Sequence, residues 1–246
     1  MTAAALRALH VPGKPLILPN AWDVDTAKLV EAAGFPVVAT SSVAVAAALG
    51  FPDGDKAPAD EMFAAAARIV GAVGVPVSVD AESGYGLSGK ELAGRLLDAG
   101  AVGCNFEDTD NSTGEVRPVA VQAERIAALR QAAGDALVIN ARIDSFRGAA
   151  DERALLSEGV ARAKAYFEAG ADCVYPIHLR TPELIGEFAA QVGGPVNAPC
   201  PPGGPGLAAL AGLGVARISL GGGLWSHTRK FVAEALASVA KGEMPY

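Results

Sequence analysis

The chain has 246 residues, of which 51% are hydrophobic and 19% are charged, so it has enough apolar material for a large globular core. The formal net charge is −7 and no run of Lys or Arg occurs, which excludes nucleic acid and anionic membranes as expected partners. No linker or shift in composition divides the sequence, and we predict a single domain over residues 1–246.

Two charge-free stretches, 32–52 and 188–216, are interrupted by Gly and Pro, and we expect neither of them to span a membrane. The segment 1–14 carries Arg7 and His10 within its apolar run, so we expect no signal peptide, and we expect His10 on the surface. The cysteines are odd in number and lack the spacing of metal ligands, which indicates reduced thiols in a cytoplasmic protein. They are Cys104, Cys173 and Cys200.

Short apolar segments alternate with Ala-rich helical patterns along the whole chain. The expected strands are 16–18, 37–40, 75–80, 102–107, 137–141, 173–175, 195–198 and 216–220. The expected helices are 24–33, 60–72, 88–99, 119–133, 152–169, 182–192, 207–213 and 224–240. Several helical patterns end at a Gly just before the next strand, where a left-handed residue terminates a helix at little cost.

Eight strand–helix pairs with short connections predict a (β/α)8 barrel. The alternative is an open doubly wound sheet, which usually has fewer strands, and no Gly-x-Gly-x-x-Gly follows the first strand. Active sites in such barrels lie at the C-terminal ends of the strands. The polar residues at these ends are Asn20, Asp23, Thr40, Ser41, Ser42, Asp80, Glu82, Glu107, Asp108, Asn140, Arg142, Asp144, Tyr175, His178, Asn197, Arg217 and Ser219.

The clearest signal for a site is the segment 76–86, PVSVDAESGYG, in which a buried strand ends in acids and glycines. Asp80 and Glu82 are two residues apart, so their carboxylates face the same side if the strand geometry persists. Glu107 and Asp108 end the next strand in the same way. Carboxylates that converge from neighbouring strands suit a hard cation such as Mg²⁺, whereas the alternative role for each acid is to cap a following helix.

Several motifs together resemble the isocitrate lyase/phosphoenolpyruvate mutase superfamily over about residues 16–224. These motifs are Asn20-Ala-Trp-Asp23, Thr40-Ser41-Ser42, Gly50-Phe-Pro-Asp53-Gly, Asp80-Ala-Glu82-Ser-Gly-Tyr-Gly86, Asn105-Phe-Glu107-Asp108 and Asn140-Ala-Arg142-Ile-Asp144. The resemblance implies a (β/α)8 barrel, a bound Mg²⁺ (or Mn²⁺) and 2-oxo-acid or oxaloacetate-like substrates. It also implies a homo-oligomer, a dimer or tetramer, in which the last helix packs on a neighbouring subunit.

The resemblance also implies residue roles. Asp80 matches the direct metal ligand, and the acids that hold the metal's water molecules are matched by Asp53, Glu82 and Glu107. The predicted substrate-binding residues are Ser41, Ser42, Arg142 and Asn197. The predicted catalytic residues are Arg142, His178, Glu107 and Asn111.

Three of the polar residues have alternative interpretations. Arg142 could instead form a structural ion pair with Asp144 or Glu107, and His178 could instead be a loop histidine that bonds to the backbone. We interpret Arg217 as an ion-pair residue at the rim of the barrel.

The sequence departs from the superfamily in the loop after the Glu107-Asp108 pair. Isocitrate and methylisocitrate lyases carry Lys-Arg-Cys-Gly-His there, and the cysteine is their catalytic acid/base. Residues 109–115 are TDNSTGE and contain no Cys, Lys or His, so we expect neither of those two activities. Asn111, Ser112 and Thr113 provide only part of the polar set that the mutase branch carries in this loop.

We therefore predict a Mg²⁺-dependent lyase that cleaves or forms a C–C bond in a 2-oxo or 2-hydroxy carboxylic acid through a metal-stabilised enolate. The loop 109–115 would close over the site and exclude water. Two alternatives remain: a mutase or hydrolase that acts on a P–C bond of the phosphonopyruvate type, and a catalytically silent homologue that binds carboxylates.

Overall fold

The computed structural model describes residues 2–245, and parallel strands form its centre. The first strand is split at Pro19 into β1 (Leu16–Leu18) and β2 (Asn20–Ala21). The others are β3 (Val38–Thr40), β4 (Val77–Asp80), β5 (Gly103–Glu107), β8 (Val138–Ile143), β9 (Cys173–Pro176), β10 (Asn197–Pro199) and β11 (Arg217–Ser219). All eight predicted strands are therefore present, with ends shifted by up to two residues.

The strand pairings run round a ring. One sheet has the order β2-β3-β4-β5-β8-β9 and a second has the order β1-β11-β10. The two sheets share the split first strand, and a parallel bridge between Val174 and Val196 joins β9 to the segment just before β10. Every pairing in the ring is parallel, as the predicted (β/α)8 barrel requires.

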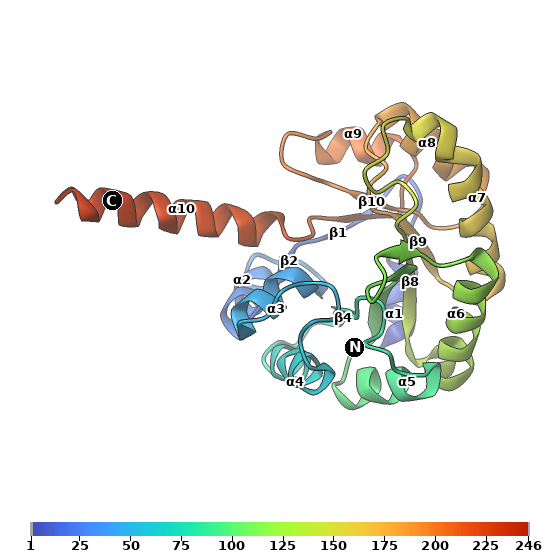
Figure 1. The fold of residues 1–246 in the computed structure, drawn as a ribbon, viewed down its shortest axis with the longest axis horizontal. Coiled ribbons are helices and arrows are strands. Elements are labelled where there is room, and N and C mark those ends of the chain that lie inside the picture. The colour runs from blue at the N-terminus through green and yellow to red at the C-terminus, as the bar shows by residue number, and fades with distance from the viewer. Residues whose placement is uncertain (1, 246) are drawn as a thin grey trace.

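Helices follow the strands and lie around the outside of the ring (Figure 1). They are α2 (Val24–Ala32), α3 (Ser42–Leu49) and α4 (Ala59–Val70), α5 (Gly89–Asp98), α6 (Val119–Ala133), α7 (Glu152–Glu168), α8 (Pro182–Val192) and α9 (Leu207–Gly212). A short 3₁₀ helix, Gly134–Ala136, continues α6. The sequence did not predict α3, because its Ala-rich segment has almost no polar face to give a helical period.

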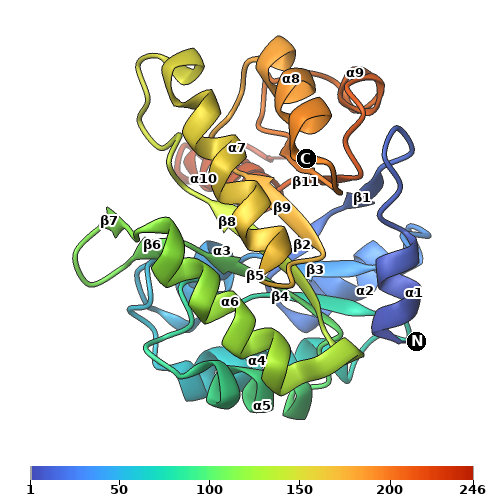
Figure 2. The same ribbon diagram turned by 90° about the vertical axis from the view of Figure 1, so that its right-hand side faces the viewer.

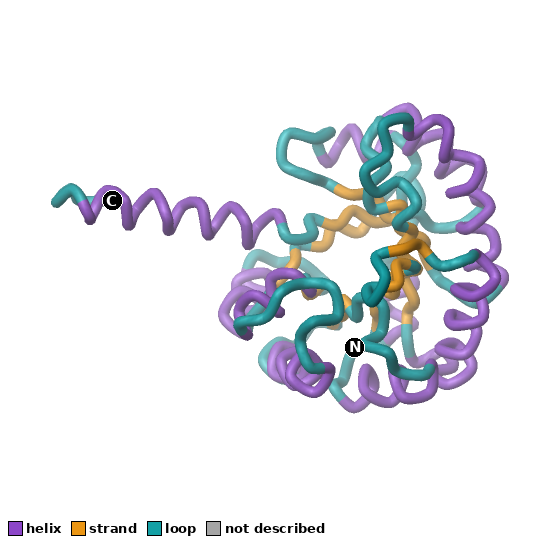
Figure 3. The backbone as a smooth tube through the Cα atoms, viewed as in Figure 1, coloured by secondary structure: helices purple, strands orange, loops and turns teal. Residues whose placement is uncertain are grey.

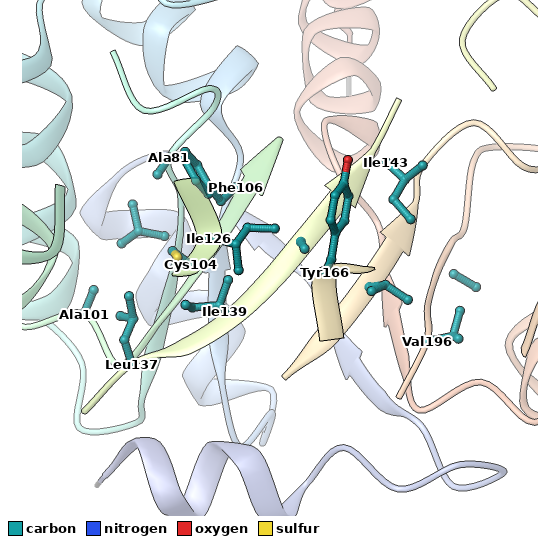
Figure 4. Packing of buried hydrophobic residues seen from close by; sticks show 14 of the residues in the cluster. Ala81, Ala101, Cys104, Phe106, Ile126, Leu137, Ile139, Ile143, Tyr166 and Val196 are labelled. Carbon is teal, nitrogen blue, oxygen red and sulfur yellow. The ribbon is translucent and has the colours of Figure 1, made fainter. Parts of the chain in front are cut away.

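The main hydrophobic core lies between the strands and the outer helices. Outward-facing strand residues such as Cys104 and Ile139 pack against helix residues such as Ile126 and Tyr166 (Figure 4). The alternation of a β-strand explains this layer, since every second side chain must face the helices. Burial raises the pKa of the Cys104 thiol to about 12, which makes it an inert packing residue.

The N-terminal end of the barrel is closed by α1 (Ala3–Ala8), which the sequence did not predict. Leu6 packs into the ring, and a Cβ on Gly103 would lie 2.8 Å from Leu6 Cδ2, so this strand position needs glycine. His10 follows α1 and is 7% exposed, which makes the expected surface position wrong. Figure 2 shows α1 at the opposite end of the molecule from a short antiparallel hairpin, β6 (Thr109–Asp110) with β7 (Glu115–Val116).

Above α1, the inward-facing side chains become polar. Barrels of this type usually fill their interior with branched apolar residues. Here the inward positions of several strands carry Ser78, Asn105, Asn140, Asn197, Arg217 and Ser219, all buried. Arg217 has no carboxylate within 4 Å among residues 2–245, so the expected rim ion pair is not formed and the guanidinium lies inside the barrel.

The last helix, α10 (Gly223–Ala240), leaves the barrel instead of covering it (Figures 1 and 3). None of its residues is buried, and Phe231 and Leu236 are 59% and 63% exposed. No helix among the described residues is long and apolar enough to cross a membrane. The apolar side chains of α10 therefore face open space within a single chain.

Candidate active site

The ends of β3 and β4 place Asp80 next to the start of α3. The backbone N–H of Ser42 donates to Asp80 Oδ2 at 3.0 Å, and the backbone N–H of Asp80 donates to Thr40 Oγ1 at 2.8 Å. Ser42 Oγ also donates to Asp53 Oδ1 at 3.4 Å, which brings the predicted acid of the β3–α4 connection to the same place. Ser41 is buried and precedes α3 as its N-cap residue.

Glu82 is held by two neighbouring loops. Tyr85 OH donates to Glu82 Oε1 at 3.1 Å, and the backbone N–H of Asp55 donates to Glu82 Oε2. These three residues all have positive φ, between 47° and 58°, in the left-handed region that non-glycine residues rarely adopt. Such conformations cost about 1–3 kcal/mol each and gather at functional sites. Sequence reasoning did not select Asp55, although it directly follows the motif Gly50-Phe-Pro-Asp53-Gly.

Arg142 lies between two carboxylates at the ends of β5 and β8. Its Nη1 is 2.5 Å from Glu107 Oε2, and its Nε and Nη2 donate to the two oxygens of Asp144 at 2.7 and 3.0 Å. Asn111 Nδ2 donates to the other Glu107 oxygen at 2.8 Å. The ion pairs weighed as the alternative for Arg142 are thus both formed, and they hold its guanidinium at the mouth of the barrel.

Asp108 does not join the acids of the site. Its Oδ2 accepts from Tyr166 OH at 2.8 Å and lies 3.3 Å from Arg162 Nη1, on the helix side of the barrel wall. Its Oδ1 accepts from the backbone N–H of Asp144 at 2.9 Å. Adjacent residues on a strand face opposite sides, which is why Glu107 points inward and Asp108 outward.

His178 and Asn197 lie apart from the acids. His178 is half-buried after β9, where burial lowers its pKa, the Asp144 charge raises it and the Arg142 charge lowers it. Asn197 is fully buried inside the barrel and donates from Nδ2 to Ser219 Oγ at 3.0 Å. The structure therefore gathers Asp53, Asp80, Glu82, Glu107, Asn111, Arg142 and Ser42 at one mouth, with His178 at its edge and Asn197 below.

Burial and mutual repulsion raise the pKa values of three acids at the mouth of the barrel. The pKa of Glu107 is raised to about 8. Burial is the largest cause and the charges of Asp144 and Asp80 add to it, while the charge of Arg142 opposes it. Burial likewise raises the pKa of Glu82 to about 7, with additions from Asp80 and Asp53. Burial and the Asp80 charge raise the pKa of Asp53. Several carboxylates thus share a buried space in which Arg142 is already paired with Asp144.

The residues present fit a divalent cation. Asp80 Oδ1 is buried and has no hydrogen-bond partner, which is costly for a carboxylate oxygen unless another group binds it. A cation beside it would also relieve the repulsion that raises the pKa values of Glu82 and Glu107. Among residues 2–245, no three acidic, His or Cys side chains enclose a metal by themselves. A cation here would therefore need water molecules or a ligand among its contacts, as Mg²⁺ usually has.

Comparison with known proteins places the chain in a family. The profile of the family described as phosphoenolpyruvate phosphomutase matches residues 6–240. The chain belongs to this family. It is therefore a member of the isocitrate lyase/phosphoenolpyruvate mutase superfamily, as the motifs predicted.

Three relatives illustrate the range of the family. A putative phosphonomutase structure from Burkholderia cenocepacia J2315 superposes with a TM-score of 0.90 at 46% identity, covering 98% of this chain and 99% of that one. Phosphoenolpyruvate phosphomutase of Streptomyces hygroscopicus is 32% identical over 95% of this chain and 77% of that protein. The probable 2-methylisocitrate lyase 2 of Corynebacterium glutamicum is 33% identical over 79% of this chain and 65% of that protein. The prediction of an enzyme from this superfamily is confirmed.

The raised pKa values predict that the metal-free protein loses stability as the pH rises. The pKa values of Glu82 and Glu107 are raised in the folded protein from 4.5 to about 7 and about 8. The stabilisation that their protonation gives is therefore complete below pH 4.5 and is lost as the pH rises to about 8. Between pH 6 and pH 9 we expect the Tm to fall by roughly 3–10 °C without metal, and less with Mg²⁺.

Differential scanning calorimetry in EDTA and in Mg²⁺ measures this effect. Glu82→Gln should flatten the pH dependence, whereas the change Glu124→Gln on the exposed face of α6 should leave it unaltered. A Tm that rises from pH 6 to pH 9 in EDTA would contradict the prediction.

Proposed function

We propose that the protein is a Mg²⁺-dependent lyase that cleaves or forms a C–C bond in a 2-oxo or 2-hydroxy carboxylic acid. The observation that carries this proposal is the unpartnered Oδ1 of Asp80 among carboxylates of raised pKa, with the cationic Arg142 close enough for its charge to interact with that of Asp80. When bound there, the cation would stabilise the negative charge that develops on a carbonyl oxygen as the C–C bond breaks.

Other residues at the mouth would bind the substrate and transfer protons. Arg142 has N–H groups beyond those it gives to Glu107 and Asp144, and in this proposal they orient a substrate carboxylate. Ser41 and Ser42 lie at the N-terminus of α3, whose N–H groups favour an anionic oxygen. Glu107, with its pKa near 8 and its bond from Asn111, is poised to hold or release a proton near neutral pH.

The β6–β7 hairpin would cover the mouth. It is anchored at its base by the ion pair of Arg117 Nη2 with Asp110 Oδ2 at 3.2 Å, while Ser112 to Glu115 at its tip are exposed. A hairpin with a fixed base and a free tip can close over a ligand and exclude water. Asn111 at its start already contacts Glu107, so closure would act directly on the proton-holding group.

The alternative is chemistry at a P–C bond, supported by the 46% identical putative phosphonomutase and by the phosphomutase relative. The same acids and Arg142 would serve it. A homologue that only binds carboxylates is the third candidate, because residues 109–115 lack the lyase cysteine.

Asp80→Ala should abolish divalent-ion binding and turnover, because the other acids would hold an ion only through water. Isothermal titration with Mn²⁺ measures binding, and mass spectrometry of a Mg²⁺-dependent screen of 2-oxo and 2-hydroxy acids measures turnover. Asp60→Asn on exposed α4 is the matched control and should behave as the wild type. Full activity of Asp80→Ala in EDTA would contradict the proposal.

The screen also separates the three candidates. Turnover of a 2-oxo or 2-hydroxy acid to two carbon fragments supports the lyase. Turnover of phosphonopyruvate alone favours the mutase or hydrolase. Tight binding of oxalate or pyruvate with no product from any compound favours the silent homologue.

We expect no cysteine to take part in the reaction. Cys104 lies in the core and Cys200 donates to the backbone oxygen of Pro205 in the loop after β10, and all three cysteines are free thiols, as suits the proposed cytoplasmic location. Cys104→Ser and Cys200→Ser should each keep kcat/KM within about tenfold of the wild type. Assays of both variants on the substrate found in the screen test this, and loss of turnover in a stably folded variant would show that a thiol is required.

We propose that α10 packs on a second copy of the chain, giving a dimer or a tetramer. Its exposed apolar side chains include Leu224, Phe231, Val232, Leu236 and Val239, a patch that a monomer would leave in water. Light scattering at micromolar concentration should give a multiple of 24.8 kDa, and a mass near 24.8 kDa would contradict the proposal.

A double variant tests the same surface. Phe231→Asp with Leu236→Asp should dissociate the oligomer, because each charge would be buried against the partner. Lys230→Ala on the same helix, whose side chain is 72% exposed, is the control and should leave the mass unchanged.

A further inference from the structure

Arg217 spans the interior of the barrel beneath the carboxylates. It starts on β11 and its Nη2 donates to Asn105 Oδ1 at 3.1 Å on β5, which lies on the opposite side of the ring. Its Nε donates to Ser219 Oγ at 3.3 Å. The side chain is 1% exposed, so the whole guanidinium sits inside the protein.

This buried charge lacks a direct counter-ion. Both of its hydrogen-bond acceptors are neutral, its Nη1 has no partner, and no carboxylate lies within 4 Å of it in the described part of the chain. An unpaired charge and an unsatisfied donor are each costly in a protein interior. Burial accordingly lowers the pKa of Arg217.

Asp80 is a carboxylate whose charge acts on Arg217. It pairs in register with Asn105 on the neighbouring strand, so its side chain and the guanidinium flank the same residue. The other titratable groups that act on Arg217 are Cys173, Tyr175 and His10, together with Cys104 from the helix side of β5. These groups are neutral at pH 7, since burial raises the pKa values of the thiols and of the phenol and lowers that of His10 to about 4.

The free Nη1 has matching acceptors in the same interior layer. Asn140 Oδ1 and Asn197 Oδ1 are buried and also lack partners. Asn140 shares the Asn105 acceptor with Arg217, and Asn197 shares Ser219. A water molecule that accepts from Nη1 and donates to these amide oxygens would satisfy all three atoms.

We propose that Arg217 is a positioning residue that forms a charged floor, with buried water, beneath the carboxylates of the proposed metal site. Its positive charge offsets part of their negative charge and so weakens the binding of a divalent cation at Asp80. The effect is exerted through space and through Asn105, not by contact with substrate. This inference rests on the proposed metal-dependent function.

Mn²⁺ titration of the full chain at pH 8 and low salt tests the charge of Arg217. Arg217→Met and Arg217→Gln, which are both neutral, should bind Mn²⁺ about tenfold more tightly than the wild type. Arg217→Lys keeps the charge and should bind within about threefold of the wild type. Arg95→Met removes an exposed, ion-paired arginine on α5 and is the matched control, for which we expect no change.

The outcomes separate this inference from the proposed function. A wild type that binds no Mn²⁺ would overturn both. Wild-type binding with unchanged or weaker binding in both neutral variants would overturn only the role of Arg217. If the neutral variants unfold without metal, recovery in saturating Mg²⁺ supports the charged floor. Failure to recover while Arg217→Lys folds would make the positive charge a purely structural requirement and would overturn its role in metal binding.

Discussion

The balance of charge at the barrel mouth constrains the whole site. Asp53, Asp80, Glu82, Glu107 and Asp144 converge there, and the cation Arg142 contacts two of them, Glu107 and Asp144. Arg142 gives two donors to Asp144 and one to Glu107, so Asp144 stays ionised and Glu107 takes the raised pKa. Glu82, Glu107 and Asp144 are buried, and buried carboxylates this close together persist only when protons or cations offset their charge. The site is therefore built for a positive partner.

The barrel explains how the acids come together. Neighbouring parallel strands end on one rim, and their period of two sends alternate side chains inward. Glu107 therefore enters the site while Asp108 stays behind the wall with Arg162 and Tyr166. The loops contribute contacts that the strands do not. Asp55, Glu82 and Tyr85 adopt left-handed conformations, and the backbone N–H of Asp55 and the phenol of Tyr85 donate hydrogen bonds to Glu82.

The sequence predicted most of this fold because its periodicities are local. Strand ends, helix ends at glycine and the acids at the strand ends are all readable from short segments. What it missed depends on tertiary contacts. Nothing local shows that residues 3–8 form a helix that fills the barrel floor, or that the last helix turns away from it. A long cationic side chain is rarely buried without an acid, which favours a position at the rim for Arg217, yet this side chain crosses the interior.

The distribution of charge at the mouth also restricts which chemical groups a ligand can carry. Acids from β3, β4 and β5 lie on one side of the mouth, and Arg142 and His178 come from β8 and β9 on the other. A small molecule that satisfies both sides needs oxygen atoms for a cation at one end and an anionic group for Arg142 at the other. In the proposed reaction Glu107 would hold the proton, and its pKa near 8 arises from the same crowding of carboxylates that would attract a cation. Cation binding would lower that pKa, so the metal and the proton-holding group are coupled by one electrostatic field.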